Sequence, residues 1–251
     1  AHRAIMEKLW TRPLVATYLE RFPSSGGATV LVAEARCGYV PLRWAEQLGE
    51  DTRIIALDPS RSMLDQARQR VDEELARRVF FVPQRVSSLS YADGVFKGAV
   101  CMNGMATALQ LRAGLEELAR VVEPGGELLV ITPTAGCFPQ LYDLFEEALQ
   151  AHDIGDAIDR LHDLKGAFIW ESHLYERAME QGLREVQLER SRWEVAFESG
   201  REALMSPMLR ETFFSHWLGA IRSSDREPVL RYVADAIDTY FHGRVFTCTV
   251  E

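Results

Sequence analysis

The sequence predicts an α/β fold, in which a parallel β-sheet carries helices on both faces. From residue 28 onward, short apolar runs alternate with longer amphipathic stretches, which is typical of strands joined by crossover helices. Two turn-forming segments, residues 23–27 (P-S-S-G-G) and residues 124–126 (P-G-G), interrupt the apolar pattern. With 251 residues, of which 47% are hydrophobic, the chain is long enough for one large α/β domain that carries a helical insertion.

The first half of the chain is expected to contain the parallel strands and their helices. Strands are expected at residues 29–33, 53–57, 79–82, 98–101 and 127–132, and helices at residues 41–48, 62–77 and 112–121. Pro41 suits a first helical turn, where an N–H group has no partner within the helix, and the Ser60 hydroxyl can cap the next helix.

The pattern changes at both ends of this region. Residues 1–27 predict an N-terminal helical segment, and residues 28–251 predict one domain. Within that domain, residues 138–182 are mostly helical in pattern, two strands are expected within residues 185–199, helices within 201–241, and a last strand at 244–250. We therefore divide the domain into a first half (28–133), a helical insertion (134–184) and a final part (185–251).

Charge and composition exclude several classes of partner. A formal charge of −9 argues against binding nucleic acid or an anionic membrane, because both are polyanionic. No apolar run approaches the ~18 residues of a membrane span. The four cysteines form no C-x-x-C pair, so neither a metal site nor a disulfide framework is predicted, and the cytoplasm is the expected location. Because the chain begins at Ala1 without methionine, we expect a processed product or a piece of a longer protein.

Three segments resemble the motifs of one enzyme family. Residues 56–64 (A-L-D-P-S-R-S-M-L), residues 118–127 (L-A-R-V-V-E-P-G-G-E) and residues 30–40 (V-L-V-A-E-A-R-C-G-Y-V) are similar, in order, to segments of the class I S-adenosylmethionine-dependent methyltransferases. The resemblance implies a Rossmann-like, seven-stranded methyltransferase sheet with helices on both faces and a helical cap. It makes residues 28–133 the cofactor-binding half, with residues 185–251 completing the sheet.

Three residues match the cofactor-binding positions of this family. Asp58 ends the second predicted strand, where the family's acidic residue accepts hydrogen bonds from the ribose hydroxyls. Glu34 matches the acidic residue that organises the first loop and the amino-acid moiety of the ligand. Gly38 matches the central glycine of that loop, where a side chain is expected to collide with the ligand.

Four other residues depart from the family pattern. Arg36 and Val40 replace small residues of the first loop, and a β-branched valine resists glycine-only backbone angles, so the loop is expected to follow a different path. Arg85 replaces an aspartate that accepts the adenine amino hydrogen, and arginine has only donors. Lys97 replaces an aspartate at the start of the fourth strand. We hypothesise that the Arg36 guanidinium pairs with Glu34 or Asp58 and occupies space that the cofactor needs.

Three functions remain open at this point. The favoured hypothesis is a non-catalytic methyltransferase-fold protein that acts through a protein partner, because the cofactor is a sulfonium cation and three of the departures add positive charge. The alternative is an active methyltransferase that uses S-adenosylmethionine and a small-molecule acceptor, with no catalytic residue assigned, because the family relies on holding the acceptor in line. The third is a protein that binds another anionic ligand, such as a nucleotide. The sequence does not indicate an oligomeric state.

Overall fold

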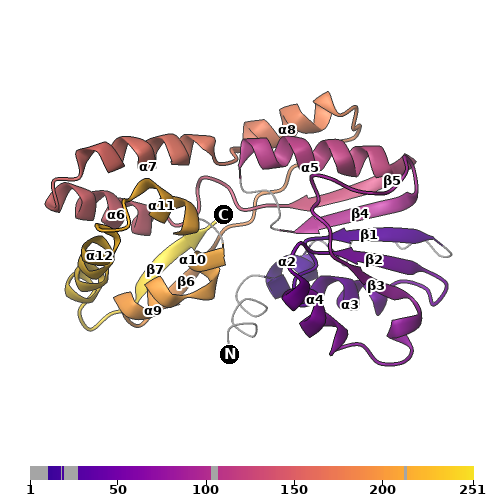
Figure 1. The fold of residues 1–251 in the computed structure, drawn as a ribbon, viewed down its shortest axis with the longest axis horizontal. Helices are drawn as coiled ribbons and strands as arrows, with labels where there is room; N and C mark the ends of the chain where they lie inside the picture. Colours follow the sequence, from indigo (N-terminus) through magenta and orange to yellow (C-terminus); the bar gives the residue numbers. More distant parts are fainter. Residues whose placement is uncertain (1–10, 18, 20–27, 103–106, 212–213) are drawn as a thin grey trace. The chain divides into compact units, whose positions relative to one another are not determined.

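The structure, a computed structural model, describes residues 11–17, 19, 28–102, 107–211 and 214–251 (Figure 1). The chain divides into two compact units. The first unit consists of residues 1–105, 109–132 and 175–186, and the second of residues 106–108, 133–174 and 187–251. The domain boundaries expected from the sequence stay predictions.

The first unit is built on a parallel sheet. Its strands are β1 (Thr29–Ala33), β2 (Arg53–Leu57), β3 (Val79–Val82), β4 (Phe96–Met102) and β5 (Val122–Ile131), in the order β3-β2-β1-β4-β5. The first three strands occupy the predicted residues. The fifth strand begins earlier than predicted, because residues 123–126 form a bulge between the pairs Phe96–Val122 and Gly98–Glu127. Gly125 lies in this bulge with a φ of 82°.

Helices lie on both faces of this sheet. They are α2 (Arg12–Thr17), α3 (Tyr39–Ala45), α4 (Arg61–Arg68), the short 3₁₀ helix η3 (Leu75–Arg77) and α5 (Ala108–Val121). Helices α3 and α4 join β1 to β2 and β2 to β3, toward one edge of the sheet, whereas α5 joins β4 to β5, toward the other edge. Right-handed crossovers therefore place α5 on the opposite face. The Ser60 cap is confirmed, since its Oγ accepts the Met63 amide at 3.4 Å. Of the predicted segment 1–27, residues 1–10, 18 and 20–27 lie outside the described residues.

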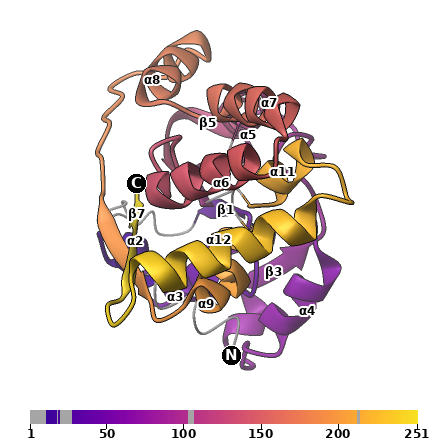
Figure 2. The ribbon, with the colours of Figure 1, turned by 90° about the vertical axis from the view of Figure 1, so that its left-hand side faces the viewer.

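The second unit combines helices with a separate pair of strands. Its elements are α6 (Pro139–Ala151), α7 (Gly155–Ala167), β6 (Trp193–Phe197), α9 (Gly200–Met205), α10 (Pro207–Glu211), α11 (Phe214–Ala220), α12 (Arg226–Tyr240) and β7 (Phe246–Val250), while α8 (Glu171–Glu180) is divided between the two units. Figure 2 shows α6 and α12 side by side. The Tyr232 hydroxyl on α12 donates to Glu147 Oε1 on α6 at 2.7 Å.

The expected single sheet of seven strands is not what the described residues form. β6 and β7 pair with each other in antiparallel orientation, so these residues contain a five-stranded sheet and a two-stranded sheet. Only one strand, β6, lies within residues 185–199, where two were predicted. The alternation of apolar and polar residues indicates that a segment is a strand, but it does not select the partner of that strand.

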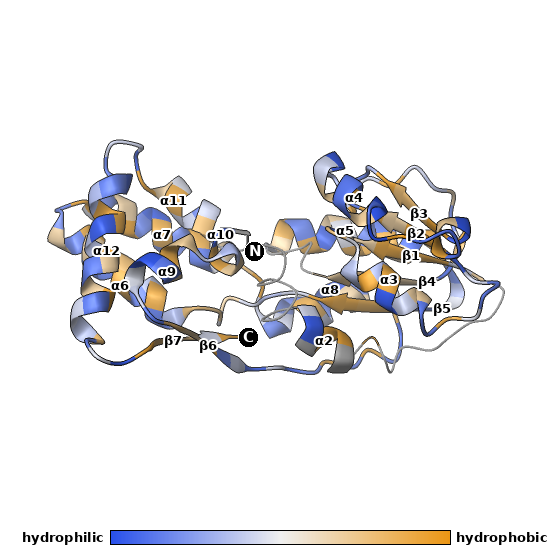
Figure 3. Ribbon diagram, turned by 90° about the horizontal axis from the view of Figure 1, so that it is seen from below, coloured by the Kyte–Doolittle hydropathy of each residue, from blue (hydrophilic) through white to orange (hydrophobic). Residues whose placement is uncertain are grey.

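Burial of the strands accounts for the core of the first unit. Val30, Leu31 and Val32 of β1 are all at most 2% exposed, and Figure 3 shows the strands of this sheet mostly in hydrophobic colours. Strands covered on both faces need such continuous apolar runs, which is why the sequence predicts them well. Within the described residues, no helix is long and apolar enough to cross a membrane.

One buried cation ties the end of α3 to β3. Arg78 is 9% exposed, and its guanidinium donates to the carbonyl oxygens of Ala45 at 2.7 Å, Gly49 at 3.1 Å and Leu48 at 3.3 Å. These carbonyls belong to the end of α3 and the turn that follows, where a helix has no further N–H donors of its own. Arg78 therefore caps the helix that begins at the loop after β1.

Candidate functional site

The candidate site lies at the carboxyl ends of β1, β2 and β3. The sheet register pairs Ala33 with Leu57 and Leu57 with Val82, so the residues that follow these strands are neighbours. Glu34 and Asp58 are the first residues after β1 and β2. This edge of a parallel sheet is where ligands bind in open α/β folds.

Asp58 holds the loops that follow β1 and β2 together. Its side chain is buried, since the residue is 3% exposed. Its Oδ2 accepts the Arg36 amide at 2.8 Å, and its Oδ1 accepts the Ser60 amide at 2.8 Å. Each carboxylate oxygen has two lone pairs and can accept a second hydrogen bond. The predicted role of Asp58 as the acceptor for a ribose stays a prediction.

The loop between β1 and α3 repeatedly adopts left-handed backbone conformations. Glu34, Arg36 and Gly38 have φ values of 57°, 48° and 82°. Arg36 therefore takes backbone angles that glycine adopts more readily, at a cost of about 1 to 2 kcal/mol. Its contact with Asp58 is a main-chain hydrogen bond. The hypothesis that the Arg36 guanidinium pairs with Glu34 or Asp58 stays a prediction.

Gly38 is required by the packing of two helices. A Cβ atom at Gly38 would lie 2.8 Å from Ala67 Cβ and 3.3 Å from Ala67 Cα on α4. The motif predicts a close approach of the ligand at this glycine, whereas the structure shows a close approach of α4. Ala67 was missed because a single alanine in a helical pattern gives no signal of its own.

We expect Gly38→Ala to destabilise the protein by about 2 to 4 kcal/mol, because it adds a steric clash to an unfavourable positive φ. The free energy of unfolding in urea measures this loss. Gly166→Ala is the matched control, since Gly166 lies in α7 with open space around its Cα, and should be neutral or slightly stabilising. A loss at position 38 no larger than at position 166 would show that α4 yields to the added methyl group.

Two of the four departures from the family pattern lie outside the site or cause no strain there. Val40 is not among the residues with positive φ; it lies in the first turn of α3 and is 5% exposed. A glycine is therefore not needed at this position. Lys97 lies at the amino end of β4, where Gly98 pairs with Val30, and its Nζ forms an ion pair with Glu123 at 2.5 Å. Whether either residue affects cofactor binding stays a prediction.

The side chains of Asp58, Arg36 and Arg85 act electrostatically on the carboxyl group of Glu34. Burial and, to a smaller extent, the neighbouring Asp58 carboxylate raise the pKa of Glu34 from its usual value of 4.5 to about 7, although Arg36 and Arg85 act to lower it. Arg85 is exposed and lies in a turn closed by a hydrogen bond from the Ser88 amide to the Arg85 carbonyl. Its predicted place beside an adenine stays a prediction.

We expect the stability contribution of Glu34 to depend on pH. Because its folded pKa of about 7 lies above the unfolded value of 4.5, the unfolded state ionises first and the protein loses stability as the pH rises from 4.5 to 7. Glu34→Gln should therefore stabilise the protein by up to about 3 kcal/mol at pH 8 and not at pH 4.5. Urea unfolding at both pH values measures the difference. The exposed Glu50→Gln should show no such change, and equal behaviour of the two variants would contradict the burial argument.

Arg70 also holds this loop, although no motif of the sequence points to it. Its Nη1 donates to the Cys37 carbonyl at 2.9 Å and fixes the loop just before Gly38 from the far end of α4. No motif includes this arginine, so no pattern could identify it. The site thus combines a buried carboxylate, a carboxyl group with a raised pKa and a loop held by main-chain contacts.

The comparisons with known proteins show which proteins this chain is similar to. Residues 32–126 match the methyltransferase domain family. Demethylmenaquinone methyltransferase of Desulfitobacterium hafniense is 30% identical over 144 residues, which are 56% of this chain and 55% of that protein. A ubiquinone/menaquinone biosynthesis C-methyltransferase of Hahella chejuensis is 25% identical over 144 residues, 56% of each chain. The chain thus spans about half the length of the curated relatives it matches.

Solved structures agree on the fold. The YcgJ protein of Bacillus subtilis has a TM-score of 0.59 at 15% identity, with 95% of this chain and 96% of that chain covered. A putative methyltransferase of Bacillus halodurans has a TM-score of 0.57 at 17% identity, with 94% of each chain covered. These comparisons support the resemblance of residues 32–126 to methyltransferase domains and show that the chain has the methyltransferase fold. If it is active, its cofactor is S-adenosylmethionine. None of these comparisons supports a degraded cofactor motif or a non-catalytic role.

Proposed function

We propose that this protein is an active S-adenosylmethionine-dependent methyltransferase with a small-molecule acceptor. The observation that carries the proposal is the Asp58 carboxylate, held at the end of β2 by the amides of Arg36 and Ser60. The non-catalytic hypothesis rested on four departures from the family pattern. Val40 lies in the first turn of α3, Lys97 pairs with Glu123, and Arg36 meets Asp58 through an amide that every residue except proline possesses, which supports an intact site.

The charges around the loop fit the cofactor. Arg36 and Arg85 act on Glu34 together with Asp58, so two guanidinium groups are offset by two carboxyl groups. The repulsion of the cationic cofactor expected from the sequence is therefore reduced. The remaining lone pairs of Asp58 would accept hydrogen bonds from the ribose hydroxyls, and ionised Glu34 would attract the ammonium group of the amino-acid part. The bound cofactor would supply a methyl group on a sulfonium sulfur.

The relatives support the choice of a small-molecule acceptor. Those named above carry the names of demethylmenaquinone and ubiquinone/menaquinone biosynthesis methyltransferases. Their similarity covers 56% of this chain, and the family match ends at residue 126. Most of the second unit lies beyond the family match, so it is the part that would select the acceptor.

Calorimetric titration with S-adenosylmethionine and S-adenosylhomocysteine tests the proposal. We expect wild-type protein to bind both, and Arg36→Gly to bind them within about threefold of wild type, a difference of less than 1 kcal/mol. Absence of binding by wild-type protein together with binding by Arg36→Gly would restore the non-catalytic hypothesis. Titration with ATP in the same series would identify a nucleotide-binding protein if ATP alone bound.

A further inference from the structure

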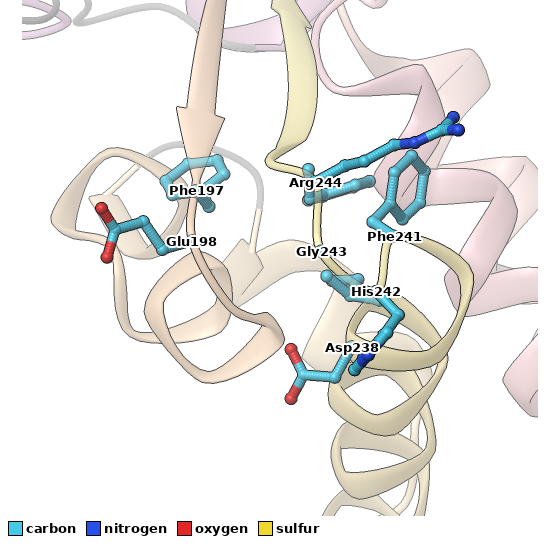
Figure 4. Close-up of a pocket in the computed structure, with 9 residues that line it drawn as sticks. Phe197, Glu198, Asp238, Phe241, His242, Gly243 and Arg244 are labelled. Atoms are coloured by element: carbon cyan, nitrogen blue, oxygen red, sulfur yellow. The ribbon is translucent and has the colours of Figure 1, made fainter.

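A cleft of about 210 Å³ in the second unit does not bring its polar side chains together. It lies between the end of β6 and the segment that joins α12 to β7 (Figure 4). Phe197 and Phe246, which line it, are 3% and 1% exposed, and the Glu198 carboxylate turns away from Asp238 (Figure 4). In the first unit, by contrast, polar groups converge on Arg120 in the last turn of α5.

The Arg120 guanidinium makes five hydrogen bonds, as many as it has N–H groups. Its Nε donates to Glu117 Oε1 at 2.8 Å and its Nη2 to Glu117 Oε2 at 3.0 Å, which forms a forked ion pair within α5. The other bonds reach the segment before β4. They join Nη1 to the Tyr91 carbonyl at 2.7 Å and to Asp93 Oδ1 at 2.9 Å, and Nη2 to the Leu89 carbonyl at 3.0 Å.

Glu117 and the main chain of Arg120 hold the same segment. The Leu89 amide donates to Glu117 Oε2 at 2.6 Å, and the Gly94 amide donates to the Arg120 carbonyl at 3.0 Å. Hydrogen bonds from Arg120 hold the pKa of Glu117 below its usual value, so the ion pair persists at neutral pH. Residues 89–94 are therefore fixed to α5 at both ends.

The chain between this segment and β3 is closed on itself. The Gln84 side chain donates to Ser90 Oγ, and the Ser90 amide donates back to Gln84 Oε1 at 3.2 Å. Within this loop, the Ser88 amide donates to the Arg85 carbonyl at 3.1 Å. Ser90 adjoins Leu89, so a loop that is compact in itself is fastened to α5 at one end and to β3 at the other.

Arg85 depends on this loop for its position. Its side chain is exposed and forms no hydrogen bond or ion pair within the part of the chain that the structure describes. It nevertheless acts on Glu34, whose pKa it lowers together with Arg36, against burial and the Asp58 carboxylate. The backbone of the loop therefore decides how strongly Arg85 acts on the candidate cofactor site.

We propose that Glu117 and Arg120 are positioning residues of the cofactor site. From α5 they hold the loop of residues 84–90 at the end of β3, and they thereby place the Arg85 guanidinium near Glu34. The inference rests on the proposed function in so far as the site binds a cofactor. The placement of Arg85 can be measured without any ligand.

The pH titration of Glu34, followed through its ¹³C carboxyl signal in ligand-free full-length protein, tests this placement. Arg85→Gln should raise the midpoint by roughly 0.5 pH unit, because it removes a positive charge that favours the carboxylate. Arg120→Met releases the loop and should raise the midpoint as well. In Arg120→Met protein, Arg85→Gln should then add less than about half of its effect in wild type. If the charge of Arg120 merely acted on Glu34 from a distance, Arg85→Gln would have the same effect in both backgrounds, and this result would overturn the proposal.

Two further variants separate position from charge and from folding. Arg120→Lys keeps the positive charge but replaces the planar fork with a single ammonium group, so it should also raise the midpoint. It supports the same comparison with Arg85→Gln if Arg120→Met fails to fold. Arg112→Met removes an exposed positive charge from the same helix and should leave the midpoint unchanged. A rise as large with Arg112→Met as with Arg120→Met would overturn the proposal.

Calorimetric titration with S-adenosylhomocysteine distinguishes this inference from the proposed function. We expect Arg120→Met to bind it about threefold to tenfold more weakly than wild type, a loss of about 0.7 to 1.4 kcal/mol. Coupling of Arg85 to Arg120 in the titration of Glu34, without binding of S-adenosylhomocysteine by wild-type protein, would contradict the proposed function alone. Binding by wild-type protein without that coupling would overturn the positioning role alone.

Discussion

Replacing Asp58 with asparagine is expected to weaken binding of S-adenosylhomocysteine by at least about 100-fold, or 2.7 kcal/mol. The carboxylate accepts two main-chain amides and, in the proposed complex, two ribose hydroxyls. The asparagine side chain has one oxygen and one NH₂ group, and the NH₂ group cannot accept from an amide. One of the loops after β1 and β2 therefore loses its hydrogen bond. Charge-assisted bonds of this kind contribute about 1.5 to 3 kcal/mol each.

The substitution should be measured by calorimetric titration and by urea unfolding of the same preparation. A loss of affinity without gross unfolding would support a direct role of Asp58 in holding the ligand. Asp65→Asn is the matched control on α4, because Asp65 is exposed and pairs only with Arg68 in the described residues. We expect this control to bind normally. If Asp58→Asn also bound normally, the carboxylate would serve the loops alone, and the ribose assignment would be wrong.

Arg78→Met is expected to destabilise the protein by about 3 to 5 kcal/mol. Methionine keeps much of the apolar length of the side chain but offers no donor to the carbonyls of Ala45, Leu48 and Gly49. These carbonyls then lack their guanidinium donor at the end of α3. Because α3 begins at Gly38, a loosened helix should also weaken the cofactor loop.

The free energy of unfolding in urea measures this effect, with Arg77→Met as the control. Arg77 is the preceding residue, is exposed and makes no side-chain hydrogen bond or ion pair in the described residues. The control should change stability by less than about 0.5 kcal/mol. Similar losses in the two variants would mean that water replaces the Arg78 guanidinium at the end of α3.

The sequence located the candidate site through strand ends. Strand β1 is a short apolar run buried on both faces, and β2 and β3 are apolar runs that are partly buried; such runs can be recognised without knowledge of their partners. Glu34 and Asp58 follow these runs directly, so the parallel arrangement brings them together. Arg70 and Ala67 also shape the loop, but they act across space from α4, and no local pattern contains that information.

The residues that depart from the family pattern differ in their backbone angles and in their positions along the strands. Arg36 and Val40 look like equivalent replacements in the sequence, yet Arg36 has a φ of 48° and Val40 lies in a helical turn. Lys97 is one of the motif residues, but it is the second residue of β4 and pairs with Glu123. It therefore lies at the amino end of that strand, whereas the site lies at the carboxyl ends of β1 to β3. These distinctions change the preferred function from a non-catalytic module to a proposed enzyme.

The sequence by itself determined the α/β class, the five parallel strands and the residues at the ends of β1 and β2. Burial of apolar runs and the chemistry of turns are local properties, so they can be inferred from neighbouring residues. Only the tertiary structure decided that β6 and β7 form their own sheet and that Gly38 serves the packing of α4. Strand partners and close contacts depend on residues far apart in the chain, whose distances no local pattern specifies.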